Sequence, residues 1–168
     1  LKNFRLSSIN QKLNLLNNLG VDFIVTKKFD KTFSKTKSIN FIKNILSQKL
    51  KARFIFVSNN FRFGNKREGD VKSLIQNEEK YNYQVIKPKP LLVSKKIVSS
   101  SLIRSYLEKG FLEKANKLLN KKWSIEGIVQ RGRQVGKKVG FPTCNIDIKD
   151  YILAKPGVYA VRVSRKNN

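Results

Sequence analysis

Along the first two thirds of the chain, segments with the apolar spacing of a helix alternate with short apolar runs typical of a strand. The helical period comes first: Ser8 and Gln11 form a capping-box candidate, and leucines follow at helical spacing until Gly20. A strand-like run comes next, because residues 21–25 are almost wholly apolar, as in a strand that helices cover on both faces. The pattern therefore predicts a helix over residues 8–19, followed by a buried strand.

The same alternation continues to about residue 120. Amphipathic stretches predict further helices, and short apolar runs predict further strands. The expected helices are a segment beginning at Ser38 and residues 70–81, 100–109 and 112–119, and the expected strands are residues 54–57 and 83–86. Repeated helix and strand units at these spacings predict an α/β domain with a parallel sheet and helices on both faces.

After Lys122 the helical pattern ends. Residues 123–129 alternate apolar with polar positions, glycines become frequent, and no helical pattern returns through residues 158–163. This texture predicts a β domain. About three strands are too few to close a barrel, so we expect this domain to continue beyond Asn168.

Composition narrows the class of protein. Hydrophobic residues make up 40% of the 168 residues, no apolar run approaches the roughly 18 residues of a membrane span, and the single Cys144 cannot form an internal disulfide. We expect a soluble, cytoplasmic protein without a membrane partner. His and Met are both absent, so catalysis must rely on phosphate-binding loops, hydroxyls, amides, cations and a metal. A chain without Met is also expected to be a fragment.

The net charge of +25 first suggests a nucleic-acid partner. Of the 36 basic residues, 27 are Lys and nine are Arg, and they are scattered over the predicted helices, loops and strands. Proteins that read bases rely on Arg, whose planar group pairs bidentately. A genome rich in A and T accounts for the abundance of Lys, Asn and Ile, so we expect no nucleic-acid partner.

Two polar stretches of the α/β region could carry chemistry. The first, residues 57–70, contains Asn60 and Arg62 and follows a predicted strand at its carboxyl end, where open parallel sheets bind ligands. Its alternative is a loop that packs on its phenylalanines. The second, residues 98–104, places three serines before a helix and Arg104 one turn into it. That arrangement predicts either a phosphate cradle or ordinary N-capping.

A third stretch, residues 127–145, combines glycines with basic residues in the β region. Glycines let the backbone approach a ligand closely, and the Arg and Lys side chains supply charge for phosphates. Thr143 and Asn145 point the same way on an extended segment and could offer a hydroxyl and an amide oxygen to one Mg²⁺ ion. The glycine spacing and the β context exclude a Walker P-loop, and a basic glycine-rich hairpin is the alternative.

In order and spacing, these stretches resemble the bifunctional riboflavin kinase/FAD synthetases of bacteria. The resemblance spans nearly the whole chain. The matching landmarks are Gly20-Val21-Asp22, Phe29-Asp30, Phe61-Arg62-Phe63-Gly64, Gly69-Asp70, Ile103-Arg104, Gly140-Phe141-Pro142-Thr143-Cys144-Asn145 and Gly157-Val158-Tyr159. The resemblance implies a Rossmann-like nucleotidyltransferase domain with a parallel sheet over residues 1–121, and the start of a β-barrel riboflavin kinase domain over residues 122–168.

The resemblance also implies two ATP-dependent reactions with Mg²⁺ as cofactor: riboflavin is converted to FMN, and FMN is converted to FAD with release of pyrophosphate. It assigns Asn60 to catalysis and, together with Arg62, to flavin binding. It assigns Thr143 and Asn145 to catalysis and to Mg²⁺. The residues it assigns to ATP and its phosphates are Ser99, Ser100, Ser101, Arg104, Gly132, Gly136, Lys137, Gly140 and Pro142.

Some positions depart from the family pattern. Ser58 replaces a common Gly, Ile97 stands where a basic residue often precedes the serines, Arg133 replaces a frequent acidic residue, and Lys137 replaces Arg. The family's His-x-Gly-His segment and the glutamate base of the kinase are missing, so we expect this chain alone to be nearly inactive. The alternatives are a nucleotidylyltransferase with another acceptor and a basic nucleic-acid-binding protein.

Overall fold

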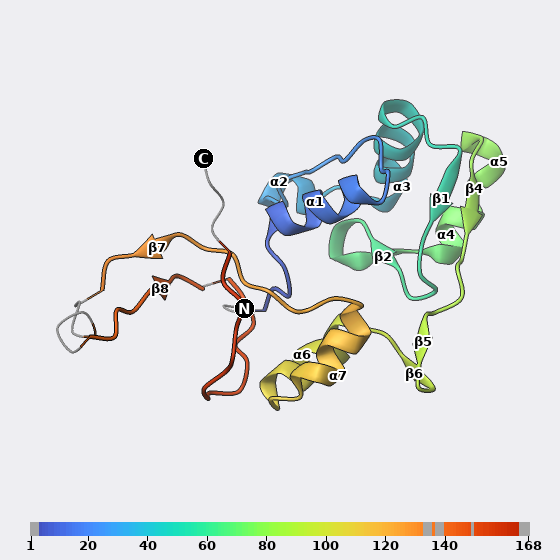
Figure 1. Ribbon diagram of the computed structural model, residues 1–168. Coiled ribbons are helices and arrows are strands. Elements are labelled where there is room, and N and C mark those ends of the chain that lie inside the picture. Colours follow the sequence, from blue (N-terminus) through green and yellow to red (C-terminus); the bar gives the residue numbers. More distant parts are fainter. Residues whose placement is uncertain (1–3, 133–135, 137–139, 149, 165–168) are drawn as a thin grey trace. The chain divides into compact units, whose positions relative to one another are not determined.

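A computed structural model of the chain describes residues 4–132, 136, 140–148 and 150–164 (Figure 1). The chain divides into two compact units. Val25–Leu91 forms one unit, and Leu1–Ile24 together with Leu92–Asn168 forms the other. Each unit has its own hydrophobic core.

The Val25–Leu91 unit contains a parallel pair of strands. β1 (Phe54–Phe56) pairs with β4 (Gln84–Ile86), and the two run side by side in Figure 1. Both lie where the apolar runs predicted them, so the mixed α/β fold with a parallel sheet is confirmed. The expected burial on both faces is wrong: Ile55 is buried, whereas the phenylalanines on either side of it are 60% and 65% exposed. Because side chains alternate along a strand, only one face of β1 is covered.

The remaining elements of this unit are short. They are the helices α2 (Lys31–Ser34), α3 (Ser38–Asn40), α4 (Val71–Ile75) and α5 (Glu78–Tyr81), the π-helix η1 (Phe41–Lys49), the 3₁₀ turn η2 (Asn65–Arg67), and the antiparallel strands β2 (Arg62–Phe63) and β3 (Gly69–Asp70). The helix expected to begin at Ser38 is therefore present, and most of its length is wound as a π-helix.

The single helix expected over residues 70–81 is broken between α4 and α5. Asp70 caps α4 by accepting a hydrogen bond from the Ser73 N–H at 2.9 Å. The Asn77 amide group donates to the Ser73 carbonyl at 2.8 Å, so it occupies the acceptor that the Asn77 N–H would use in a continuous helix. This competition between side chain and backbone explains the break.

The core of this unit joins the π-helix to the strands and to α4. Its buried members are Ile42, Ile55, Phe63, Leu74 and Tyr83. The Tyr83 hydroxyl donates to the Leu74 carbonyl at 2.7 Å, so the polar end of this buried side chain is satisfied.

The other unit begins with α1 (Ile9–Asn18), close to the predicted bounds. The expected capping box is present: the Gln11 N–H donates to the Ser8 hydroxyl at 3.0 Å, and the Ser8 N–H donates to the Gln11 amide oxygen at 2.9 Å. Gly20 follows the helix with a φ of +77°, a conformation that favours glycine. The sequence therefore predicted both ends of this helix correctly.

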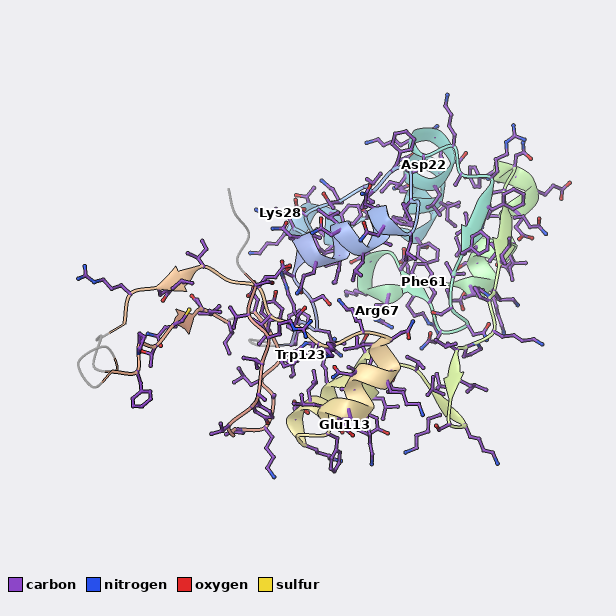
Figure 2. The ribbon with its side chains drawn as sticks, in the orientation of Figure 1. Asp22, Lys28, Phe61, Arg67, Glu113 and Trp123 are labelled. Carbon is purple, nitrogen blue, oxygen red and sulfur yellow. The ribbon has the colours of Figure 1, made fainter. Side chains whose placement is uncertain are left out.

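Two helices pack together in the same unit. α6 (Ser100–Glu108) and α7 (Leu112–Leu119) lie side by side (Figure 1) and agree with the predicted ranges. The buried residues of this core are Ile103, Leu107, Ala115 and Ile152. Trp123, labelled in Figure 2, packs against them, and its indole N–H donates to the Leu6 carbonyl at 2.9 Å. Among the described residues, no helix is long and apolar enough to cross a membrane.

The strands of this unit are short and antiparallel. β5 (Leu92–Val93) pairs with β6 (Lys96–Ile97), and β7 (Val129–Gln130) pairs with β8 (Asn145–Ile146). The β5–β6 hairpin was not predicted. Its turn residues, Ser94 and Lys95, both have positive φ, as in a type I′ turn, but they lack the Asn-Gly sequence that usually signals one.

Two predicted strands are wrong. Residues 21–25 and 158–163 form no strand, only Val129 of residues 123–129 lies in one, and Phe23 and Val158 are exposed. An apolar run on an extended backbone becomes a strand only when a neighbouring strand supplies hydrogen bonds and a face to pack on. After Lys122, the described residues contain one antiparallel pair, β7 with β8.

Candidate functional site

An aromatic cavity lies in the Val25–Leu91 unit. Its volume is about 320 Å³, near the lower limit of small-molecule sites. The residues that line it are Phe29, Phe33, Ser34, Thr36, Phe41, Arg62, Phe63, Gly64 and Arg67.

The phenylalanines of the aromatic cavity contact one another in series. The ring centroids are 5.9 Å apart for Phe29 and Phe33, 6.4 Å for Phe33 and Phe41, and 5.5 Å for Phe41 and Phe63. Pairs at these distances stabilise one another, which keeps the rings in place. The cavity therefore offers a preformed apolar surface to a planar ligand.

Of the two residues assigned to the flavin, Arg62 lines the aromatic cavity and Asn60 does not. The Arg62 guanidinium lies 3.7 Å from the Asp70 carboxylate. The pKa of Asp70 is below its usual value, chiefly because the Ser73 N–H and then the Ser73 hydroxyl bind the carboxylate, and the charge of Arg62 adds to this. Asn60 is exposed, and its amide oxygen accepts a hydrogen bond from Ser58 at 2.9 Å.

Sequence reasoning had not singled out Phe33, Phe41 or Arg67 as part of a site. They come from α2, η1 and η2, which are separated in the sequence and meet only in the fold. The signal that could have found them is the density of phenylalanine between residues 29 and 63 beside basic residues.

The serine stretch lies at the start of α6. Ser99 is the N-cap residue, and its hydroxyl accepts a hydrogen bond from the Leu102 N–H at 3.2 Å. Ser100 and Ser101 are exposed in the first turn. Arg104 donates from Nε to the Phe4 carbonyl at 2.8 Å, and its guanidinium lies 6.0 Å from the Phe4 ring centre. Capping therefore accounts for Ser99, while the hydroxyls of Ser100 and Ser101 remain available at a helix N-terminus.

The glycine-rich stretch brings four expected residues together in two pairs. The Gly132 backbone lies against the Asn145 amide group, and the Gly136 backbone lies against the Phe141 carbonyl and the Thr143 methyl group, so closely that a β-carbon on either glycine would collide. The Phe141 N–H also donates to the Gly136 carbonyl at 2.7 Å. A larger residue at Gly136 would collide with backbone, whereas one at Gly132 would require the Asn145 side chain to move.

The remaining residues of this stretch are less constrained. Gly140 and Pro142 are exposed, and Gly140 has a φ of +81°. Lys137, and Arg133, which departs from the family pattern, lie outside the described residues.

The chemistry of Thr143 and Asn145 suits a hard cation. Asn145 turns its amide nitrogen toward Gly132, and its oxygen lies farther from that glycine. Thr143 turns its methyl group, not its hydroxyl, toward Gly136. Neither oxygen is the side-chain atom nearest its glycine, and Mg²⁺ prefers oxygen ligands of this kind. Among the described residues, no group of three or more His, Cys, Asp or Glu side chains could hold a metal.

A second cavity of about 470 Å³ lies in the other unit. Its lining residues are Arg5, Ser8, Glu126, Ile128, Gln130, Asp147, Asp150 and Tyr151, none of which was predicted as a site residue. Its carboxylates bind protein groups: Arg5 lies 3.5 Å from Asp150, Ser8 donates to Glu126 at 3.4 Å, and Gln130 donates to Asp147 at 3.5 Å. These bonds connect the segment before α1 to residues 126–151, which gives the cavity a structural role.

Comparison with known proteins agrees with the predicted family. A family model described as FAD synthetase matches residues 1–102, and one described as riboflavin kinase matches residues 119–168. The bifunctional riboflavin kinase/FMN adenylyltransferase of Buchnera aphidicola subsp. Schizaphis graminum is 40% identical over 161 residues, which cover 95% of this chain and 52% of that protein. The Escherichia coli K12 protein of the same description is 33% identical over 159 residues, covering 95% of this chain and 51% of that protein.

A solved structure described as a macrolide-efflux protein from Streptococcus pneumoniae has a TM-score of 0.74 and 22% identity, covering 92% of this chain and 49% of that chain. This likeness concerns the fold alone. The chain spans about half the length of the curated relatives it matches. Since the FAD synthetase model covers more than half of its residues, the chain belongs to the FAD synthetase family.

Proposed function

We propose that the protein makes flavin cofactors in two ATP-dependent steps. In the first step riboflavin is phosphorylated to FMN, and in the second FMN receives AMP from ATP to give FAD and pyrophosphate. The observation that carries the proposal is that the FAD synthetase and riboflavin kinase models match successive parts of one chain. ATP, riboflavin, FMN and FAD are the proposed partners, and the cytoplasm is the proposed location.

The adenylyl transfer is assigned to residues 1–121, as a Rossmann-like nucleotidyltransferase domain. The aromatic cavity would take the flavin ring, with Arg62 in its wall and Asn60 contributing from the neighbouring loop. Ser100, Ser101 and Arg104 would bind ATP phosphates at the start of α6, where free N–H groups and the helix dipole favour anions. Transfer of this kind depends mainly on positioning and charge, so it needs no covalent nucleophile.

The phosphorylation of riboflavin is assigned to residues 122–168, as the first part of a β-barrel kinase domain. Thr143 and Asn145 would hold Mg²⁺, and the glycine-rich stretch with Lys137 would bind the ATP phosphates. The support is the close approach of Gly132 to Asn145 and of Gly136 to Thr143. When bound, Mg²⁺ supplies positive charge to the phosphate oxygens.

The proposal is tested with the protein expressed from its natural start to its natural stop, incubated with riboflavin, ATP and Mg²⁺. Chromatography of the products should detect FMN and then FAD, whereas unchanged riboflavin would refute the proposal. AMP transferred to a different acceptor would favour another nucleotidylyltransferase. DNA binding with a steep salt dependence and no flavin product would favour the nucleic-acid alternative.

A variant separates the two reactions. Thr143→Val keeps the shape of the side chain and removes the hydroxyl, so FMN formation from riboflavin should fall at least roughly 100-fold, as when one electrostatic contact to a transition state is lost. FAD formation from added FMN should be unchanged, because it is assigned to the other domain. Equal loss of both activities would contradict this division of labour.

A further inference from the structure

The two arginines of the aromatic cavity differ in their electrostatic surroundings. Arg62 faces Asp70 at 3.7 Å, so its charge is largely balanced. Arg67, labelled in Figure 2, also lines the cavity, but it has no such partner. Within the described ranges the ion pairs are Arg5–Asp150 and Arg62–Asp70, and the Arg67 side chain makes no hydrogen bond there. An unbalanced guanidinium therefore stands at an aromatic cavity.

The backbone that carries Arg67 is in an unfavourable conformation. Lys66 and Arg67 have φ values of 49° and 62°, which residues with a β-carbon rarely adopt. A strained turn persists only where its surroundings hold it, and it often occurs at a ligand site. This turn therefore requires contacts that fix it.

Such contacts connect the turn to the start of α3. The Asn65 N–H donates to the Thr36 carbonyl at 2.7 Å, and the Ser38 N–H donates to the Glu68 carboxylate at 2.6 Å. Gly64 packs so tightly that a β-carbon there would lie 2.8 Å from the Ser38 backbone. These contacts hold Arg67 beside the cavity without using its guanidinium.

Flat apolar walls bind an aromatic ring, and a free guanidinium binds an oxyanion, with geometry that suits phosphate in particular. We propose that Arg67 selects phosphorylated over unphosphorylated flavin, by binding the FMN phosphate while the phenylalanines hold the ring. The inference rests on the proposed function and adds the residue that determines its specificity.

Selection of FMN over riboflavin at this cavity would favour the adenylyl transfer reaction. In adenylyl transfer an oxygen of the FMN phosphate attacks the α-phosphorus of ATP, a new P–O bond forms, and the bond to pyrophosphate breaks. Riboflavin lacks that phosphate, so riboflavin bound in the cavity would only block the reaction. A charge that favours FMN over riboflavin reduces this inhibition.

The test measures FAD formation from FMN and ATP in the full-length protein, with lumiflavin as a competing ligand. Lumiflavin has the flavin ring with a methyl group in place of the phosphorylated chain, so it reports binding of the ring alone and cannot be phosphorylated. For Arg67→Gln we expect the KM for FMN to rise roughly 10- to 100-fold, the usual effect of losing a charge-assisted hydrogen bond. The inhibition constant of lumiflavin should change less than about twofold.

Lys66→Gln is the matched control. It removes one positive charge from the same turn, but Lys66 does not line the cavity. It should leave the KM for FMN nearly unchanged, and Arg67→Lys should restore part of the affinity. An equal rise of KM in both Gln variants, or weaker binding of lumiflavin and FMN alike in Arg67→Gln, would overturn the inference. If the unaltered protein forms no FAD, the proposed function itself fails; if it forms FAD and Arg67→Gln leaves the KM for FMN unchanged, only the inference fails.

Discussion

Tyr83 shows how a single buried polar group links the strands to α4. It is 6% exposed, and its hydroxyl donates to the Leu74 carbonyl. Burial, followed by the neighbouring Glu78 and Tyr81, raises the pKa of Tyr83 to about 12. In an unfolded chain a tyrosine has a pKa of about 10. The contribution of Tyr83 to stability is therefore complete below pH 10 and is lost as the pH rises from about 10 to about 12.

We predict that Tyr83→Phe lowers the free energy of unfolding by about 1 kcal/mol at pH 8, because one buried hydrogen bond is lost. Between about pH 10 and 12 the difference between the two proteins should shrink, since only the parent has this phenol to ionise. Urea denaturation at pH 8, 10 and 11 measures the difference, and all other ionisable side chains are common to the two proteins. Parallel stability curves across this range would contradict the assignment.

At the scale of elements, the start of α6 holds one serine with an observed capping role and two exposed serines that we propose bind ATP. Ser99 occupies the N-cap and accepts the Leu102 N–H, while Ser101 is exposed one position after the helix begins. We predict that Ser99→Ala lowers the free energy of unfolding by about 1 kcal/mol, the usual cost of losing a cap. Ser101→Ala should leave stability within about 0.5 kcal/mol and raise the KM for ATP in FAD formation up to about tenfold, through loss of one hydrogen bond.

Thermal denaturation and initial-rate kinetics of the two variants test this distinction. Each variant loses one serine hydroxyl, and the two positions lie two residues apart, so each variant is a control for the other. Equal loss of stability in both, or an unchanged KM for ATP in Ser101→Ala, would contradict it.

The helices could be predicted from the sequence because their signals are local. Ser8 with Gln11, and Ser99 before α6, mark helix starts that the structure reproduces, and Gly20 and Gly110 follow the ends with positive φ. The interruption at Asn77 is also local, but it depends on a side chain taking a backbone acceptor, which the apolar period does not reveal.

The strands and the aromatic cavity were harder to predict because they depend on contacts distant in sequence. Residues 21–25 have the composition of a buried strand, yet they lack strand pairing among the described residues. The pairs Gly132 with Asn145 and Gly136 with Thr143 could be expected, since one glycine-rich stretch contains them all. The place of Arg67 could not be predicted, because the cavity that it lines is formed by phenylalanines that only the fold brings together.

At the scale of the whole molecule, positive charge exceeds what the acidic residues can balance. The chain has 36 basic and 11 acidic residues, and the part that the structure describes contains two ion pairs, both partly exposed. Exposed pairs contribute little to stability, whereas a large net charge of one sign destabilises a compact state by self-repulsion. Repulsion among lysines should therefore be the dominant long-range electrostatic effect on folding.

Added salt should consequently stabilise this protein. Raising NaCl from 20 to 300 mM shortens the screening length to below about 10 Å and weakens repulsion between separated lysines more than attraction within close pairs. We predict a rise in Tm of at least roughly 2–4 °C, which for a chain of this size corresponds to about 1 kcal/mol. Differential scanning calorimetry in NaCl and in KCl checks it, and agreement between the two salts excludes binding of a particular cation. A Tm that falls with salt would mean that close pairs such as Arg62 with Asp70 outweigh the repulsion, and that the excess charge is spaced widely enough to cost little.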